Sequence, residues 1–187
     1  MDALIRIGVT GHRVLTEREK IEAGVEEALD HIEQTFPDQP MTIISALAEG
    51  ADRIVAHRVL ARPNSKLIVP LPFPTSDYLT DFKTEASRNE FLALLQLANS
   101  VEEMTVTSTR DAGYEAAGEF VLNNSDLLVI IWDGKNAQGR GGTGEIVARA
   151  RARHLPFAWV HAGNRETGTL HPTSLGDEQG RVTFENF

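Results

Sequence analysis

Short apolar runs alternate with amphipathic stretches along most of this 187-residue chain. The stretches between the runs show the 3.6-residue apolar period of helices, and the runs have the length of strands. Strands that alternate with helices form βαβ units, which build a parallel sheet covered by helices on both faces. The sequence therefore predicts a doubly wound α/β fold with a mainly parallel sheet, a Rossmann-like three-layer sandwich. The predicted strands are LIRIGV, MTIIS, KLIVP, VEEMTV, DLLVIIW and PFAWVHA.

Several of these segments carry their own start and stop signals. Thr16, followed three residues later by Glu19, predicts a capping box at the start of the first helix. Pro70 is expected to end the third strand, and residues 78–99 are expected to be mostly helical. The run Leu127–Trp132 is continuously apolar, which is typical of a strand that is buried on both faces.

The domain organisation is predicted to be simple. Residues 1–163 form one nucleotide-binding domain, and residues 164–187 form a polar, turn-rich C-terminal extension. The last piece of this extension, RVTFENF, has the pattern of an extra strand. That strand either covers an edge of the sheet or leads into a further domain.

Composition excludes several classes of function. The formal net charge is -9, whereas proteins that wrap nucleic acid by neutralising phosphates are usually basic, so we expect no extended nucleic-acid partner. The chain has no cysteine, and its six histidines form no ligand pair, so we expect no metal site. No apolar run approaches the ~20 residues needed to cross a bilayer, and the N-terminus does not resemble a signal peptide. We therefore expect no membrane partner and a cytoplasmic protein.

Polar and small residues follow the predicted strands. In an open parallel sheet, ligands bind beyond the C-terminal ends of the strands, so these loops are expected to converge on one site. Arg13, with His12, is expected to contact phosphate or sugar, and Ser45 and Glu49 to contact ribose hydroxyls. Trp132 is expected to be a core residue rather than a base-stacking platform. The candidate ligand-binding residues at these strand ends are Thr10, Gly11, His12, Arg13, Ser45, Glu49, Gly50, Trp132, Asp133 and Gly134.

A glycine-rich loop, GRGGTGE, lies between the fifth predicted strand and the next helix. Its glycines let the backbone approach a ligand closely, and a helix that begins near Thr143 offers N–H groups to a phosphate. The loop matches the dinucleotide spacing G-x-G-x-x-G, but it does not follow its strand directly and no acid closes the next strand, so we reject that interpretation. A plain surface loop is the alternative. The candidate ligand-binding residues here are Arg140, Gly141, Gly142, Thr143 and Glu145.

Four motifs resemble the SLOG superfamily of Rossmann-like domains, named for the Smf/DprA and Lonely Guy proteins. They are GVTGHR, SALAEGADRIVA, SDLLVIIWDG and GRGGTGEIVARARARHLPFAWV, in the same order and at the same strand ends. The resemblance implies a pocket for a nucleotide or a nucleotide-derived phosphorylated ligand, with its phosphate near the glycine-rich loop. We expect a sensor or binding module of this kind, with no cofactor of its own and Mg²⁺ only with the nucleotide. Assembly into a homo-oligomer stays an open expectation.

The enzymatic alternative is an N-glycosidase, or phosphoribohydrolase, acting on a nucleoside 5′-monophosphate. Lonely Guy enzymes carry P-G-G-x-G-T-x-x-E, and aligning Gly142 and Thr143 on its Gly-Thr pair places Ile146 where the glutamate should be. Glu145 then falls one residue early, about 100° around the helix. Glu145 and Glu49 are the candidate catalytic residues, but this departure favours binding over hydrolysis.

The DprA branch carries a second comparable motif, Ser-Gly-Leu-Ala-x-Gly-Ile-Asp. Residues 45–52 match it, with alanine in place of its glycine and of its isoleucine. We expect Asp52 to be structural, tying this loop together through backbone N–H groups. Members of this branch bind single-stranded DNA, which the acidic charge of the present chain disfavours.

Overall fold

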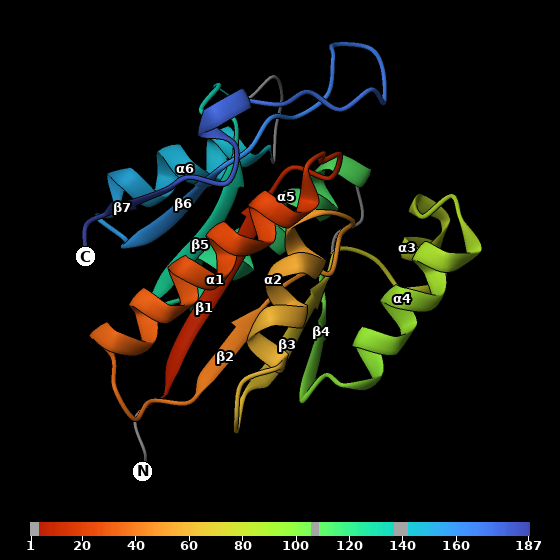
Figure 1. Cartoon of the computed structure of the whole chain (residues 1–187). Helices are drawn as coiled ribbons and strands as arrows, with labels where there is room; N and C mark the ends of the chain where they lie inside the picture. The colour runs from red at the N-terminus through yellow and green to blue at the C-terminus, as the bar shows by residue number, and fades with distance from the viewer. Residues whose placement is uncertain (1–3, 106–108, 137–141) are drawn as a thin grey trace.

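The computed structural model describes residues 4–105, 109–136 and 142–187. A central sheet lies between two layers of helices (Figure 1). The strands are β1 (Ile5–Gly11), β2 (Met41–Ile44), β3 (Lys66–Leu71), β4 (Ser100–Glu103), β5 (Leu127–Trp132), β6 (Phe157–His161) and β7 (Val182–Glu185). The helices are α1 (Arg18–Thr35), α2 (Ala51–Leu60), α3 (Thr75–Tyr78), α4 (Glu85–Gln96), α5 (Arg110–Asn124) and α6 (Thr143–Ala152), with short 3₁₀ helices η1 (Leu79–Asp81) and η2 (Gly176–Glu178).

The strand order is β4-β3-β2-β1-β5-β6-β7. The chain moves outward from β1 to β4 and then crosses back to place β5 on the other side of β1. All neighbouring strands run parallel except β7, which is antiparallel to β6. The predicted doubly wound α/β fold is therefore confirmed, and the strand order reverses between β1 and β5.

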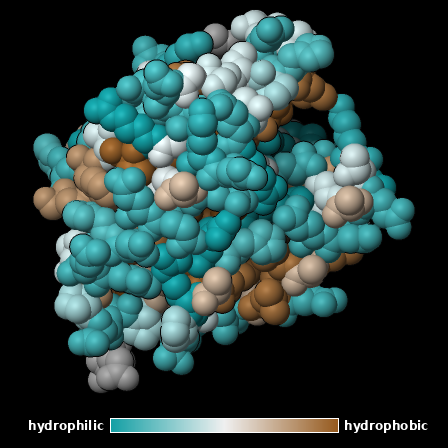
Figure 2. All heavy atoms as spheres, viewed as in Figure 1, coloured by the Kyte–Doolittle hydropathy of each residue, from teal (hydrophilic) through white to brown (hydrophobic). Residues whose placement is uncertain are grey.

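Each face of the sheet has its own hydrophobic core. The side chains of α1 and α2 pack on one face, and those of α5 and α6 pack on the other. Strand β5 supplies alternate residues to both cores, which confirms that this strand is buried on both faces. The outer surfaces of α1 and α2 are covered mainly by hydrophilic residues (Figure 2).

The predicted capping box at the first helix is wrong. Helix α1 begins at Arg18, after Glu17, which has left-handed backbone angles (φ 50°, ψ 48°) and no side-chain cap hydrogen bond. The carbonyl of Thr16 instead accepts a hydrogen bond from the side-chain amide of Gln179, at 3.0 Å. This turn is thus shaped by a contact with the distant C-terminal extension and not by local capping.

Two other element boundaries differ from the sequence prediction. The helical segment expected over residues 78–99 is divided, because Thr84 caps a new helix by accepting the Ser87 N–H at 3.1 Å. Strand β3 runs through Pro70 to Leu71. The last hydrogen bond between β2 and β3 runs from the Ser45 N–H to the Ile68 carbonyl, at 3.1 Å. Pro70 lies beyond this bond, so the ladder to β2 does not need the N–H group that proline lacks.

The C-terminal extension folds back over the start of α1 and adds β7 to the edge of the sheet (Figure 1). Its anchor is Gln179, which is 4 % exposed. The side-chain oxygen of Gln179 accepts the N–H groups of Gly163 and Leu175 at 2.9 and 3.1 Å, and its amide nitrogen donates to Thr16. One side chain therefore ties the start of the extension and the turn before β7 to the loop after β1.

We expect Gln179→Ala to lower the free energy of unfolding by about 2 kcal/mol or more, because it leaves buried backbone groups without partners. Urea denaturation measures this change, and limited proteolysis should show earlier cleavage after residue 163. The matched control is Gln34→Ala at an exposed position of α1, which should change stability little. Equal stability of the two variants would contradict the anchoring role.

Candidate functional site

A cleft of about 650 Å³ opens beyond the C-terminal ends of β1 and β5. This is the point where the strand order reverses, which is where open α/β sheets bind ligands. Its volume falls within the usual range of small-molecule sites. The residues predicted from the sequence that line it are Thr10, Gly11, His12, Arg13, Trp132, Asp133, Gly142 and Thr143.

Two glycines bring the loop after β1 close to the neighbouring elements. A Cβ atom on Gly11 would lie 2.5 Å from both the Cβ of Ala51 and the carbonyl oxygen of Ile131. Gly50 has φ +78°, and a Cβ there would lie 2.5 Å from the His12 carbonyl. That carbonyl accepts the Ala51 N–H at 3.0 Å, so β1, β5 and the start of α2 meet without side chains between them.

His12 connects the ends of β1 and β5. Its Nε2 atom accepts the backbone N–H of Asp133 at 3.1 Å, and Asp133 Oδ1 lies 3.2 Å from the same nitrogen. Burial lowers the pKa of His12, against the opposing effect of the Asp133 carboxylate, and the charge of Lys135 lowers it further. The lowered pKa favours the neutral imidazole, in which Nε2 accepts the Asp133 N–H.

Asp52 and Arg13 share the part of the cleft near β2. The Asp52 carboxyl is 8 % exposed and accepts the Ala48 N–H at 3.2 Å, which is the structural tie expected from the sequence. Burial raises the pKa of Asp52 to about 6, although hydrogen bonds from Ala48 and Ser45 and the charge of Arg13 oppose this change. The guanidinium carbon of Arg13 lies 5.1 Å from the ring centre of Tyr114.

Three cationic side chains border the cleft and form no ion pair in the described parts of the chain, although the charge of Asp52 acts on the first of them: Arg13, Lys135 and Arg165. Eleven other basic side chains form ion pairs, and they are Arg6, Arg18, Lys20, Arg53, Arg58, Arg62, Arg110, Arg149, Arg151, Arg153 and Arg181. Among the described residues Lys66, Lys83 and Arg88 also form no ion pair and do not line the cleft, so three of the six cations without an ion pair border it.

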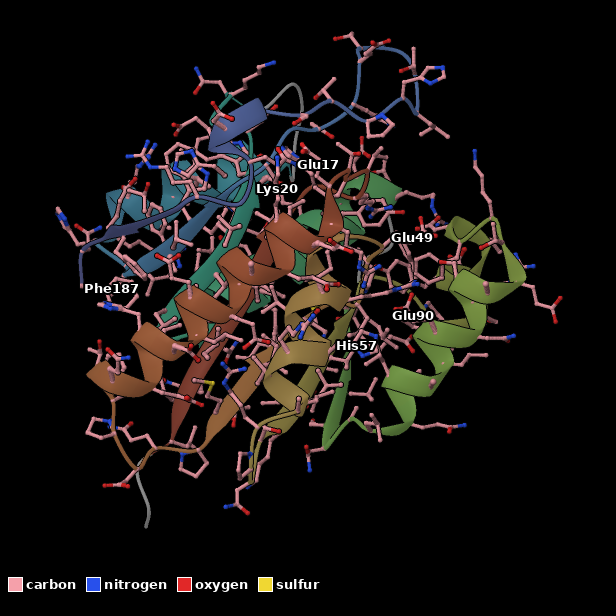
Figure 3. The ribbon with its side chains drawn as sticks, in the orientation of Figure 1. Glu17, Lys20, Glu49, His57, Glu90 and Phe187 are labelled. Carbon is pink, nitrogen blue, oxygen red and sulfur yellow. The ribbon has the colours of Figure 1, made fainter. Side chains whose placement is uncertain are left out.

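Some predicted site residues do not line the cleft. Ser45 is fully buried and accepts the Leu47 N–H at 3.0 Å. Glu49 points toward α4, where it accepts a hydrogen bond from Ser87 (Figure 3). The remaining predicted residues outside the lining are Gly50, Gly134 and Glu145. Arg140 and Gly141 lie outside the described residues.

The interpretation of Trp132 as a core residue agrees with its exposure of 4 %. Its ring centre lies 5.1 Å from that of Trp159, and its Nε1–H donates to the Lys135 carbonyl at 2.9 Å. This bond and the Asp133 side chain, which accepts the Lys135 N–H at 3.0 Å, shape the turn after β5. Trp132 therefore supports the cleft wall from the core side.

Sequence reasoning missed one side of the cleft. The C-terminal extension contributes Asn164, Arg165, Thr167 and Gly168 to the lining, and the loop after β5 contributes Lys135 and Asn136. The strand-end rule could have found Lys135, which follows β5 closely. The same rule could have found Asn164 and Arg165, which follow the parallel strand β6 about as closely as Lys135 follows β5. Nothing local in the sequence indicates Thr167 and Gly168.

No protein-family model and no curated protein matches this chain. Within residues 4–105, 109–136 and 142–187, no helix is both long and apolar enough to cross a bilayer. Across the same residues, no three His, Asp or Glu side chains are grouped so that they could hold a metal ion. The site is therefore interpreted from its own geometry and charge.

Proposed function

We propose that the cleft binds a nucleotide or a nucleotide-derived phosphorylated ligand, and that the protein acts as a sensor or binding module of the SLOG type. The observation that carries this proposal is the set of cationic side chains, Arg13, Lys135 and Arg165, that border the cleft without an ion pair in the described residues. Cations left without carboxylates in an acidic protein are suited to an anionic ligand.

The start of α6 supports the same proposal. Thr143 and Gly144, in the first turn of this helix, line the cleft. The first N–H groups of a helix have no acceptor within the helix, and they carry about half a positive charge together. A phosphate at this end of the cleft would meet these groups and the nearby cationic side chains.

Hydrolysis by a phosphoribohydrolase mechanism is the alternative proposal, and the geometry favours it less. Its candidate residues, Glu49 and Glu145, are not among the residues that line the cleft. The carboxyl groups on the described lining are those of Asp52 and Asp133. Each of these carboxyl groups already accepts a hydrogen bond from a backbone N–H group. In a catalytic role, each would have to contact the ligand through its remaining oxygen lone pairs.

We expect nucleoside monophosphates to bind at least tenfold more tightly than the nucleosides without phosphate, because a charge-assisted contact contributes about 1.5–3 kcal/mol. Isothermal titration calorimetry with adenosine and guanosine 5′-monophosphates and the two nucleosides measures this ratio. A thermal-shift series should agree, since a ligand at 100 times its Kd stabilises the fold by about 2.7 kcal/mol. Equal binding of nucleotides and nucleosides would overturn the phosphate site.

A further inference from the structure

The hydrogen bond between Asp133 and His12 determines where the imidazole carries its proton. A backbone N–H can donate only to an unprotonated ring nitrogen, and here that nitrogen is Nε2, at 3.1 Å. A neutral imidazole has one donor and one acceptor nitrogen. His12 in its neutral form therefore carries its proton on Nδ1.

The nearby Asp133 carboxylate does not change this assignment. Its Oδ1 lies 3.2 Å from His12 Nε2, but it could accept a hydrogen bond there only if that nitrogen were protonated. The same oxygen already accepts the Lys135 N–H at 3.0 Å. Burial and the charge of Lys135 keep the pKa of His12 below its ordinary value, which favours the neutral ring.

The Nδ1–H group has no acceptor among the described residues, although the side chain is only 10 % exposed. Nδ1 is not one of the buried side-chain atoms that lack a partner, so this donor is open to the solvent of the cleft, where the oxygen of a ligand can replace water. The ring lines the cleft. Other donors on the same cleft are the guanidinium of Arg13 and the first turn of α6.

We propose that His12 is a specificity-determining residue, held as the Nδ1–H tautomer by the Asp133 backbone, and that it donates this hydrogen to a phosphoryl oxygen of the ligand. The proposal rests on the proposed function for the choice of a phosphoryl oxygen, but the tautomer is a property of the ligand-free protein. An N–H donor in a fixed position favours a ligand that places an oxygen there to accept its hydrogen bond. It disfavours a ligand that places an N–H or an amino group there. His12 would thus orient the phosphate at the point where β1 and β5 meet.

The tautomer is tested by ¹⁵N NMR of the ligand-free, full-length protein with labelled histidine. The His12 resonances are assigned by their loss in His12→Asn, and the exposed His171 serves as an internal reference for an ordinary ring. We expect His12 to be protonated at Nδ1, whereas free imidazole side chains in water favour the other nitrogen. Protonation at Nε2 in the ligand-free protein would overturn the proposal whether or not any nucleotide binds.

Two variants separate the role of Nδ1 from that of Nε2. Gln in place of His12 positions an oxygen near the former Nε2, so His12→Gln keeps the acceptor for Asp133 and loses the Nδ1 donor. Asn positions its amide near the former Nδ1, so His12→Asn keeps a donor and loses that acceptor. We expect His12→Gln to weaken binding of adenosine 5′-monophosphate by about tenfold or more, and His12→Asn to weaken it clearly less. The reverse order of affinities would overturn the proposal.

The ligand atom is tested by titrating the labelled protein with inorganic phosphate, adenosine 5′-monophosphate and adenosine. We expect the Nδ1 resonance of His12 to move with the first two and not with adenosine. A shift with adenosine alone would show that His12 contacts the nucleoside, which overturns this inference and leaves the proposed function standing. Nucleotide binding without any change at Nδ1 would also overturn this inference and leave the proposed function standing. If none of the three compounds bound, both this inference and the proposed function would be overturned.

Discussion

The Asp52→Asn variant is expected to be more stable than the wild type at neutral pH, by about 3 kcal/mol. Burial raises the pKa of Asp52 from its ordinary value of 3.8 to about 6, despite the hydrogen bonds from Ala48 and Ser45 and the charges of Arg13 and Arg53. At 1.36 kcal/mol per pKa unit, the difference corresponds to about 3 kcal/mol of cost for the ionised group in the folded protein. Asparagine removes the ionisation and keeps an oxygen that can accept the Ala48 N–H.

The sign of the pH dependence follows from the direction of the change. Because the folded protein binds the Asp52 proton more tightly than the unfolded chain does, the stabilisation is complete below about pH 4 and is lost as the pH rises through about 6. Urea denaturation from about pH 4 to about pH 8 should show the variant gaining on the wild type between about pH 4 and about pH 6 and holding a constant lead above that.

The matched control is Asp177→Asn, at an exposed position in η2, which should show no such trend. An Asp52→Asn variant that is less stable than wild type at every pH would contradict the prediction. It would mean that Arg13 and the two hydrogen bonds outweigh the cost of burying the charge.

A carboxyl group that costs stability while it lines a cleft suggests a functional reason for its presence. Stabilising substitutions are commonly found at such positions, and their usual penalty is lost function. Asp52 faces the cleft close to Arg13, so it can accept a hydrogen bond from a ligand hydroxyl or amino group. The sequence indicated only its structural bond to the loop.

The fold could be predicted because its signals are local. The continuous apolar run of β5 and the period of the helices between strands depend on neighbouring residues, and both are present in the structure. The strand-end rule then placed His12, Arg13 and Asp133 on one cleft, because the C-terminal ends of parallel strands lie at the same edge of a sheet.

Long-range contacts account for what the sequence could not predict. Thr16 has the pattern of a cap, but its carbonyl is used by Gln179, which is distant in sequence. Thr167 and Gly168 line the cleft although they lie further along the extension, beyond the reach of the strand-end rule. Glu49 follows a strand as a ligand-binding residue would, yet the packing of α4 against α2 gives it Ser87 as a partner. Patterns along the chain carry no information on such pairings.

Arg13→Ala is expected to weaken nucleotide binding by about tenfold to a hundredfold, with little change in stability. Arg13 is exposed to the cleft, and its guanidinium carbon lies 5.1 Å from the ring centre of Tyr114. The hydroxyl of Tyr114 is in turn fixed by Asp81. The arginine is thus held in place by an aromatic residue and leaves most of its donors available to a phosphate, where a charge-assisted bond contributes about 1.5–3 kcal/mol.

Two further variants show whether position or total charge matters. Arg13→Lys keeps the charge but loses the planar fork, so it should recover only part of the affinity. Lys66→Ala removes the same charge from an exposed residue at the start of β3, at the opposite end of the strands, and should leave affinity almost unchanged. Calorimetric titration with adenosine 5′-monophosphate compares all three variants with wild type. If Lys66→Ala weakened binding as much as Arg13→Ala, the effect would be one of net charge, and Arg13 would have no contact with the ligand.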